Sequence, residues 1–421
     1  MEFLKHALPV NPIETQELNI SVYEIIDSVR QDGDKALVKY NTRFDGNNRE
    51  SLRVTREEIE AAYKKVEPEL LEDMRLAAEH IRKFALAQKE TIRPLENFEQ
   101  TPGLVLGHRI IPVDSCLCYV PGGNYPLYSS ALMLVIPAKA AGVKRIAACS
   151  PAVSGSTSIH PLTLAALDIA GADEIYALGG AHGIAAFTYG TEQIKPVDMI
   201  VGPGNQYVTE AKRQCFGKVG IDFIAGPSEV LTICDDTGNA SFIAADMIAQ
   251  SEHDLKSKGI VITTDKALGI NIIKEVERQL EKLSTRERAK KAWIDNGDVI
   301  LVDSVEEACR LSNEYAPEHL ELHIREEGES RAVSLLNNYG SLFIGALSAE
   351  VFGDYISGTN HTLPTVKASR YTGGVYVGTF LKTCTYQKIN REGLEKIGMP
   401  AYRMAKGEGL HGHANAALIR L

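Results

Sequence analysis

Long apolar runs and basic stretches are both missing from this sequence. No apolar run approaches the roughly 20 residues that are needed to cross a bilayer. The start, "MEFLKHALPVNPIETQ", lacks the apolar core of a signal peptide. We therefore expect a cytoplasmic protein without a membrane partner. The formal net charge is −10 over 421 residues, which argues against a nucleic acid as the main partner.

Cysteine pairs at metal-binding spacing are also missing. The seven cysteines are scattered, their number is odd, and no Cys-x-x-Cys occurs. Neither a disulfide framework nor a thiolate zinc site is expected. Most of these residues stand among Ile, Val and Ala, where a thiol packs as a small apolar side chain.

The sequence does contain two series of strand-like runs that alternate with helical segments. Amphipathic helical patterns fill the region before Pro112. Short β-rich runs then follow, including "CLCYV", "KRIAACS" and "DMIVG", and a second series begins near Val230 with "VLTICD", "GIVITTD" and "LELHI". This alternation predicts an α/β fold with two parallel sheets wrapped by helices. We expect a cleft between the two units, with ligands at the carboxyl ends of the strands.

Glycine-rich segments follow two of the predicted strands, in "YALGGAHG" and "IVGPGN". Glycines there let backbone N–H groups approach a phosphate near a helix N-terminus. Neither segment matches the dinucleotide pattern G-x-G-x-x-G. Tight strand-to-helix turns without any ligand explain these glycines equally well.

Histidines beside carboxylates and amides give a more specific signal. Six of the eleven histidines lie after position 250, within "QSEHD", "APEHLELH", "GDYISGTNH" and "EGLHGHAN". Gln250 and His253 would share one face of a helix. Without cysteine ligands, imidazole nitrogen together with Asp or Gln oxygen suits Zn²⁺ or another divalent first-row metal. Single histidines are more often structural, so this pattern is a hypothesis.

The adjacent pair Glu318–His319 precedes a strand-like run and is expected on a loop at a sheet edge. An adjacent carboxylate and imidazole can divide general-base work between two steps. A solvated turn is the alternative. Composition and periodicity therefore predict a two-domain α/β protein and leave metal-dependent catalysis as a hypothesis.

Motifs along nearly the whole chain carry a family resemblance. They include "YVPGG", "IPAKAAGV", "GTEQIKPVDMIVGPGNQYVTEAKR", "AGPSEVL", "AQSEHD", "APEHL", "GDYISGTNHTLPT" and "EGLHGHA". With these motifs the sequence resembles the histidinol dehydrogenase family. The resemblance implies a homodimer whose subunit has two Rossmann-like domains. It divides the chain into an N-terminal helical dimerisation segment (1–25), a discontinuous first domain (26–112 with 234–370), an NAD-binding second domain (113–233) and a tail reaching the other subunit (371–421).

The resemblance also implies ligands and roles for individual residues. One Zn²⁺ per site would be bound by Gln250, His253, Asp354 and His413, the last from the neighbouring chain. The NAD⁺ pocket would include Tyr119, His182 and Asn205. The substrate pocket would include Ser228, His361 and Glu408 together with the zinc ligands and His319.

Members of the family oxidise a primary alcohol to a carboxylate with two NAD⁺, through an aldehyde that stays bound. Carried onto this chain, His319 takes the alcohol proton as hydride leaves for NAD⁺. Glu318 activates the water that adds to the aldehyde. Zinc would orient the substrate and polarise its groups.

Departures from the family pattern bear on the substrate. His182 stands where histidinol enzymes usually have Gln, and residues 366–389, "VKASRYTGGVYVGTFLKTCTYQKI", resemble the sulfopropanediol dehydrogenase branch. That branch carries Arg in "PGGRYP", where Asn124 stands here, whereas "APEHLELH" is closer to the histidinol enzymes. We predict 2,3-dihydroxypropane-1-sulfonate as the substrate, with L-histidinol as the alternative and another small polyol or amino alcohol third. A zinc-binding homologue without catalysis is a remote alternative, because the ligand set and the Glu318–His319 pair are intact.

Overall fold

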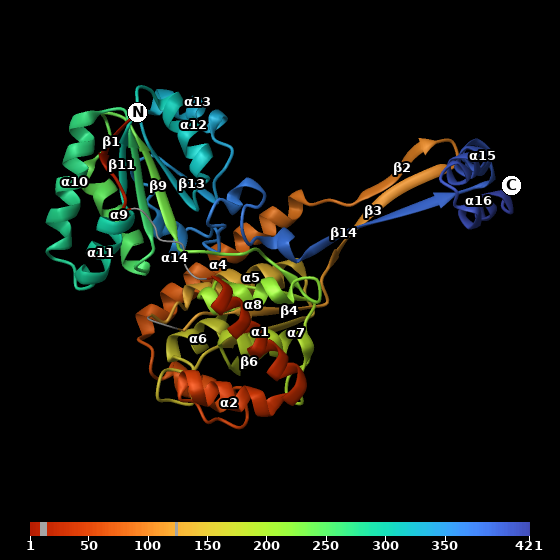
Figure 1. Ribbon diagram of the computed structural model, residues 1–421, viewed down its shortest axis with the longest axis horizontal. Helices are drawn as coiled ribbons and strands as arrows, with labels where there is room; N and C mark the ends of the chain where they lie inside the picture. Colours follow the sequence, from red (N-terminus) through yellow and green to blue (C-terminus); the bar gives the residue numbers. More distant parts are fainter. Residues whose placement is uncertain (9–14, 123–124) are drawn as a thin grey trace.

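Two α/β lobes and a projecting arm make up the structure (Figure 1). The computed structural model describes residues 1–8, 15–122 and 125–421. The predicted α/β class with two parallel-stranded sheets is confirmed. Among the described residues, no helix combines the length and the apolar character needed to cross a membrane.

The six-stranded lobe is built on a sheet of order β1-β11-β10-β9-β12-β13, in which only β1 runs antiparallel to its neighbour. Helices α9 to α11 cover one face, and α12 and α13 cover the other. The strands are β1 (Glu2–Lys5), β9 (Glu229–Cys234), β10 (Lys258–Thr263), β11 (Asp298–Leu301), β12 (His319–His323) and β13 (Ser341–Ile344). The helices are α9 (Ala240–His253), α10 (Lys266–Leu280), α11 (Arg286–Asn296), α12 (Val305–Tyr315), α13 (Glu326–Leu335) and α14 (Glu350–Tyr355).

The five-stranded lobe has a parallel sheet of order β6-β5-β4-β7-β8. Its strands are β4 (Ser115–Tyr119), β5 (Arg145–Ser150), β6 (Glu174–Ala177), β7 (Met199–Val201) and β8 (Gly220–Ile221). Its connecting helices are α5 (Ser129–Ala141), α6 (Pro161–Ala170), α7 (Gly180–Tyr189) and α8 (Gln206–Cys215). Helix α5 is buried nearly all round, as expected for a helix whose sequence is apolar on every face.

The N-terminal helices belong to the five-stranded lobe, which corrects the predicted domain boundaries. They are α1 (Thr15–Asp32), α2 (Asp34–Asp45), α3 (Arg56–Tyr63) and α4 (Pro68–Thr91). Apolar residues of α1 and α2 pack with α7 and α8, and those of α3 and α4 pack with α5 and α6. The prediction had assigned residues 26–112 to the same domain as the other lobe. The apolar stripe of an amphipathic helix shows that the helix packs on something, but it does not show which sheet. Residues 1–25 are also not wholly helical, because β1 is an edge strand of the six-stranded sheet.

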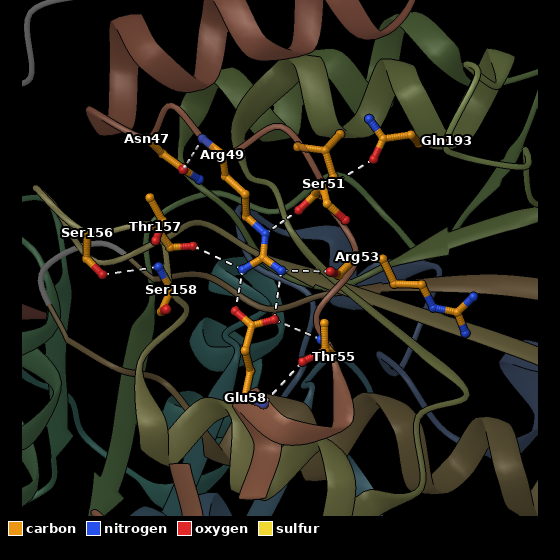
Figure 2. A network of polar contacts seen from close by, with 11 residues as sticks. Asn47, Arg49, Ser51, Arg53, Thr55, Glu58, Ser156, Thr157, Ser158 and Gln193 are labelled. Carbon is orange, nitrogen blue, oxygen red and sulfur yellow. Dashed lines mark hydrogen bonds and ion pairs between the residues drawn. The ribbon is translucent and has the colours of Figure 1, made fainter. Parts of the chain in front are cut away.

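Arg49 fixes the loop between α2 and α3 (Figure 2). Its guanidinium donates to both carboxylate oxygens of Glu58, at 2.5 and 2.8 Å, and to the carbonyl oxygens of Arg53 and Thr157 at 2.7 and 3.3 Å. Glu58 also completes a capping box with Thr55 at the start of α3. A paired guanidinium and carboxylate with several carbonyl acceptors is a strong form of polar contact. This contact network secures α3 on the five-stranded lobe.

The arm is a three-stranded antiparallel sheet that carries two helices at its tip (Figure 1). It consists of β2 (Leu95–Thr101), β3 (Leu104–Pro112) and β14 (Leu381–Ile389), followed by α15 (Arg391–Gly407) and α16 (His411–Leu418). Short 3₁₀ helices, η1 (Ala368–Arg370) and η2 (Val377–Phe380), lie just before β14 in the chain. The predicted tail therefore pairs with residues that had been assigned to the first domain, since β14 aligns with β3 from Leu381↔Pro112 to Ile389↔Leu104.

Both faces of the arm are largely exposed to solvent. Nearly every residue of β2 and β14 is exposed. Cys384 on β14 is the one exposed thiol among the seven cysteines, all of which lie in the described residues. Large apolar side chains are exposed here as well, including Phe98 at 48%, Met404 at 72% and Ile419 at 70%.

Candidate active site

Helix α9 brings Asp246, Gln250 and His253 onto one of its faces. The side chain of Asn239 caps the start of α9 by accepting from the backbone N–H groups of Ser241 and Phe242. Residues spaced i, i+4 and i+7 then lie in a row along the helix. Asp246 and Gln250 are buried, whereas His253 at the C-terminal end is exposed.

Strand β12 supplies a second row, because alternate residues of a strand point to the same side. Leu320 and Leu322 join the core under α12 and α13, so His319, Glu321 and His323 face the side covered by α9. All three are at most 4% exposed. A central strand of a parallel sheet is normally apolar on both faces, and this polar row is therefore an exception that marks a site.

His319 lies among three carboxyl groups. Its Nδ1 is 3.9 Å from Glu318 Oε2 and 3.7 Å from Glu350 Oε2, and its Nε2 is 3.5 Å from Asp354 Oδ1. Burial on its own would lower the pKa of His319, but Glu318, Glu350 and Asp354 raise it well above its usual value. An imidazole with a raised pKa is a stronger base, and it can accept a hydroxyl proton only while its ring is neutral.

Glu318 is fixed in place and is a stronger base than an ordinary carboxylate. Its Oε2 accepts a hydrogen bond of 2.9 Å from the backbone N–H of Glu229. Burial raises the pKa of Glu318 to about 8, although the neighbouring His319 opposes that shift. A carboxylate with this pKa can take a proton from water near neutral pH.

A cavity of about 120 Å³ opens beside this pair, and both lobes line it. Its walls include five predicted site residues: Ser228, His253, Glu318, Asp354 and His361. The ring of His361 shares a hydrogen bond of 3.1 Å with the hydroxyl of Ser129 at the start of α5. Ligand pockets usually measure roughly 300–1,000 Å³, so the cavity formed by one chain suits only a small molecule.

The two sheets present opposite ends to this region. Pro203, which follows β7, lines the cavity from the five-stranded lobe. Ser228 and Glu318 line it from the other lobe, directly before β9 and β12. The expectation that ligands gather at carboxyl ends therefore fits only the five-stranded sheet. In the other lobe the site lies at the amino ends, because α9 runs back along the sheet and places His253 there.

The predicted NAD⁺ residues lie at or behind the carboxyl edge of the five-stranded sheet. Strand order reverses around β4 and β7, and a crevice at such a point is the usual nucleotide site. Tyr119 ends β4, and its hydroxyl accepts a hydrogen bond of 3.1 Å from the N–H of Gly180. Asn205 caps α8. A Cβ on Gly202 would lie 2.2 Å from the carbonyl oxygen of Tyr119, so only glycine fits between them.

His182 lies behind that edge rather than on it. Its side chain is buried in α7, and its Nε2 is 2.9 Å from Asn41 Oδ1 on α2. The rings of Tyr40 and Phe44 pack close by, with centroids 5.8 and 6.0 Å away. These contacts of His182 are all with residues of α2.

His413 and Glu408 are remote from the cavity of their own chain. Glu408 follows α15 and His413 lies in α16, both at the tip of the arm (Figure 1). Both residues are exposed. One chain thus brings His253 and Asp354 to the same cavity, with Gln250 one helical turn before His253 on α9, but it does not bring these two residues there.

The donor set that one chain assembles fits a divalent metal. Gln250 is 1% exposed, and its side-chain Nε2 has no hydrogen-bond partner. A cation cannot satisfy this NH₂ donor, but a 180° turn of the amide would put its oxygen in the same place, where it could serve a cation together with His253 and Asp354. Two oxygen donors and one nitrogen suit Zn²⁺, with one further position for a donor from elsewhere.

Several residues of this region were missed from the sequence. Glu350 stands one helical turn before Asp354 on α14 and contacts His319. Asp246, Glu321 and His323 form a group of potential metal ligands deeper in the lobe. Alternation within "HLELH" was the available signal for the strand residues, because it places their polar side chains on one face of a buried strand.

Comparison with known proteins identifies the fold and the chemistry. A family model described as histidinol dehydrogenase matches residues 10–421. The chain belongs to the histidinol dehydrogenase family. It is 45% identical over 402 residues to "Histidinol dehydrogenase homolog 1" of Mesorhizobium japonicum, covering 95% of this chain and 79% of that relative. It is also 45% identical over 427 residues to the histidinol dehydrogenase of Bacillus cereus, covering 100% and 98%.

A crystal structure of histidinol dehydrogenase from Elizabethkingia anophelis has the same fold. The TM-score is 0.92 at 39% sequence identity, over 98% of this chain and 94% of that one. Histidinol dehydrogenases are NAD-dependent oxidoreductases that act on CH–OH groups and use Zn²⁺. This family member is accordingly an oxidoreductase with NAD⁺ and Zn²⁺ as its cofactors.

The burial of His182 predicts an acid-sensitive fold. Burial lowers its pKa to about 3, against about 6.5 in an unfolded chain. Below pH 6.5 only the unfolded state takes up this proton, so the free energy of unfolding falls as the pH falls. Urea titrations measure the free energy of unfolding at each pH. Between pH 7 and pH 4.5, this free energy should fall by about 2–3 kcal/mol less in His182→Gln than in the native chain. His108→Gln, on the arm, is the control, and equal losses in all three proteins would contradict the prediction.

Proposed function

We propose that this enzyme oxidises L-histidinol to L-histidine with two NAD⁺. The observation that best supports this substrate is the charge of the cavity wall. Glu318 and Asp354 lie in it, and no Lys or Arg is among its described lining residues. L-Histidinol brings a cationic amine, which carboxylates attract, whereas a sulfonate would find no lysine or arginine among the described wall residues and would have to pair with the Zn²⁺ itself. Relatives at 43–45% identity that are named histidinol dehydrogenase also support this substrate over the sulfonate favoured from the sequence.

Two residues divide the proton transfers. His319 takes the proton of the alcohol hydroxyl in the first oxidation. Glu318 takes a proton from the water that adds to the aldehyde, and its position is set by the N–H of Glu229. Overall, alcohol, one water and two NAD⁺ give carboxylate, two NADH and three protons. When bound, NAD⁺ accepts the hydride, and Zn²⁺ supplies positive charge that orients and polarises the substrate oxygen.

We propose a homodimer in which each cavity is completed by the arm of the other chain. His413 would then complete the zinc ligands Gln250, His253 and Asp354, and Glu408 would face the imidazole of the substrate. Two observations support this arrangement. The two residues lie at the tip of an arm that leaves its own lobes (Figure 1). The arm also exposes large apolar side chains, which mark interaction surfaces on soluble proteins.

A second candidate substrate is 2,3-dihydroxypropane-1-sulfonate. It is favoured by residues 366–389, where the sequence resembles the sulfonate branch. Lys367, the second residue of this region, lies only two residues after Thr365, which lines the cavity. Asn124, where the sulfonate branch carries arginine, lies outside the described residues.

The substrate is tested by counting NADH formed per molecule of a limiting alcohol, with metal-replete enzyme. We expect two NADH per L-histidinol and none from the sulfonate. Two NADH per sulfonate and none from histidinol would overturn the proposal and point to residues 366–389 as the specificity element. Activity with neither alcohol would also reject histidinol as the substrate.

The division of labour predicts separable defects. His319→Gln should slow alcohol oxidation by about 10²–10⁴-fold, since that is the usual contribution of a general base, and should leave the zinc content unchanged. Glu318→Gln should slow oxidation of added aldehyde more than oxidation of the alcohol. In the native enzyme the aldehyde rate should rise towards pH 8, because the raised pKa of Glu318 requires that pH for ionisation, and Glu318→Gln should lack this rise. Equal losses in both steps would contradict the assignment.

Shared sites predict complementation between two inactive variants. His253→Ala and His413→Ala chains, mixed in equal amounts and allowed to exchange, should recover about a quarter of native activity. Half of the dimers are then mixed, and one of the two sites in each carries neither change. The matched control mixes His253→Ala with Asp354→Ala. Within each proposed site these two residues belong to the same chain, so every site of a mixed dimer keeps one change and no activity should return. No recovery in the first mixture, despite proven exchange, would exclude shared sites.

A further inference from the structure

A second group of potential ligands lies deeper in the six-stranded lobe than the cavity. Asp246 on α9 faces Glu321 and His323 on β12, and their ligand atoms lie within 4.8 Å of one another. The three residues are 7%, 0% and 3% exposed. None of them lines the cavity, and the proton transfers described above do not use them.

His323 is the independent sign of a missing partner. Neither of its ring nitrogens has a hydrogen-bond partner, and its Nε2 is 3.9 Å from Glu321 Oε2. Buried imidazoles are nearly always hydrogen-bonded or coordinated, and an exception requires an explanation. Burial lowers the pKa of His323 to about 4, so its ring is neutral and offers a lone pair, as a metal ligand must.

The carboxyl groups of Asp246 and Glu321 are buried together, and with both ionised they would need a cation to balance their charge. Burial, together with Glu321, raises the pKa of Asp246 to about 8, because two buried carboxylates cannot both ionise without a cation. Glu321 is already oriented, with Oε2 accepting from Thr232 Oγ1 at 2.7 Å and Oε1 accepting from the N–H of Glu350 at 3.3 Å. Such outer hydrogen bonds typically fix ligands that bind a metal.

We propose that Asp246, Glu321 and His323 bind a second divalent first-row cation, such as Zn²⁺, which ties α9 to β12 in a structural role. Two carboxylate oxygens and one imidazole nitrogen are a suitable donor set for this class of ion. The cation neutralises both carboxylates and gives His323 its partner. This site is separate from the zinc site of the proposed catalysis, because Gln250 lies one helical turn further along α9 and Asp354 lies on α14.

Metal counting on the full chain tests this site. The protein is produced with zinc, dialysed, and its zinc per chain is measured by mass spectrometry. We expect two zinc ions per native chain and one in His323→Gln. The double variant His253→Gln/Asp354→Asn, which removes the ligands beside the cavity, should keep one. Adding His323→Gln to that double variant should remove the last ion, and His108→Gln should keep both.

The double variant decides the proposal, because it leaves the three residues unaltered. A zinc content of zero in this folded variant would overturn the proposal and leave Asp246 and Glu321 as a carboxyl pair that shares a proton. An unchanged count in His323→Gln would overturn it as well. If His323→Gln does not fold, Glu321→Gln takes its place, since this near-isosteric change removes a charged ligand but keeps an oxygen for Thr232. Cobalt in place of zinc adds an absorption spectrum that should lose the contribution of one ion in the same variants.

Discussion

The placement of polar side chains on β12, a strand enclosed on both faces, is the constraint on which the site depends. Leu320 and Leu322 enter the core on one side, and this anchors the strand so that His319, Glu321 and His323 must face α9. Buried polar groups are costly unless they find partners. The positions opposite them, on α9 and α14, therefore need polar side chains that can serve as partners, and an apolar side chain of the right size would not be enough. A shift of β12 by one residue would move this whole row into the apolar core.

The same row connects the centre of the lobe to its surface. Glu350 contacts His319 through its carboxylate and Glu321 through its backbone N–H. The Glu318–His319 pair and the deeper group of Asp246, Glu321 and His323 are thus neighbours in one polar layer. At the outer end of the row, Glu318 and Asp354 line a cavity that also receives residues of the five-stranded lobe, such as Pro203 after β7. The two sheets meet with opposite polarity, carboxyl ends against amino ends.

Much of the fold follows from local sequence patterns. The central strands β4, β5, β9, β10 and β12 are β-branched or apolar runs between turn residues, and α1 to α4 carry clear apolar stripes, so both kinds of element were predicted. The arm strands were not, because a segment such as "LENFEQT" is exposed on both faces and has no apolar alternation. Docking of the N-terminal helices on the five-stranded lobe was also missed, since it depends on contacts distant in sequence. Within the site, the resemblance named His253, Glu318, His319 and Asp354, whereas Glu350 and Asp246 became visible only through their neighbours in space.

Exposure along the arm has a practical consequence for studying assembly. Six of the seven cysteines are buried, and Cys384 stands alone on the surface of β14. A thiol-reactive fluorophore or spin label will therefore mark the arm of the unaltered chain, with no engineered cysteine and no removal of the others. The label reports directly on what surrounds the arm at each protein concentration, through its accessibility to quenchers or through the distance between two labels.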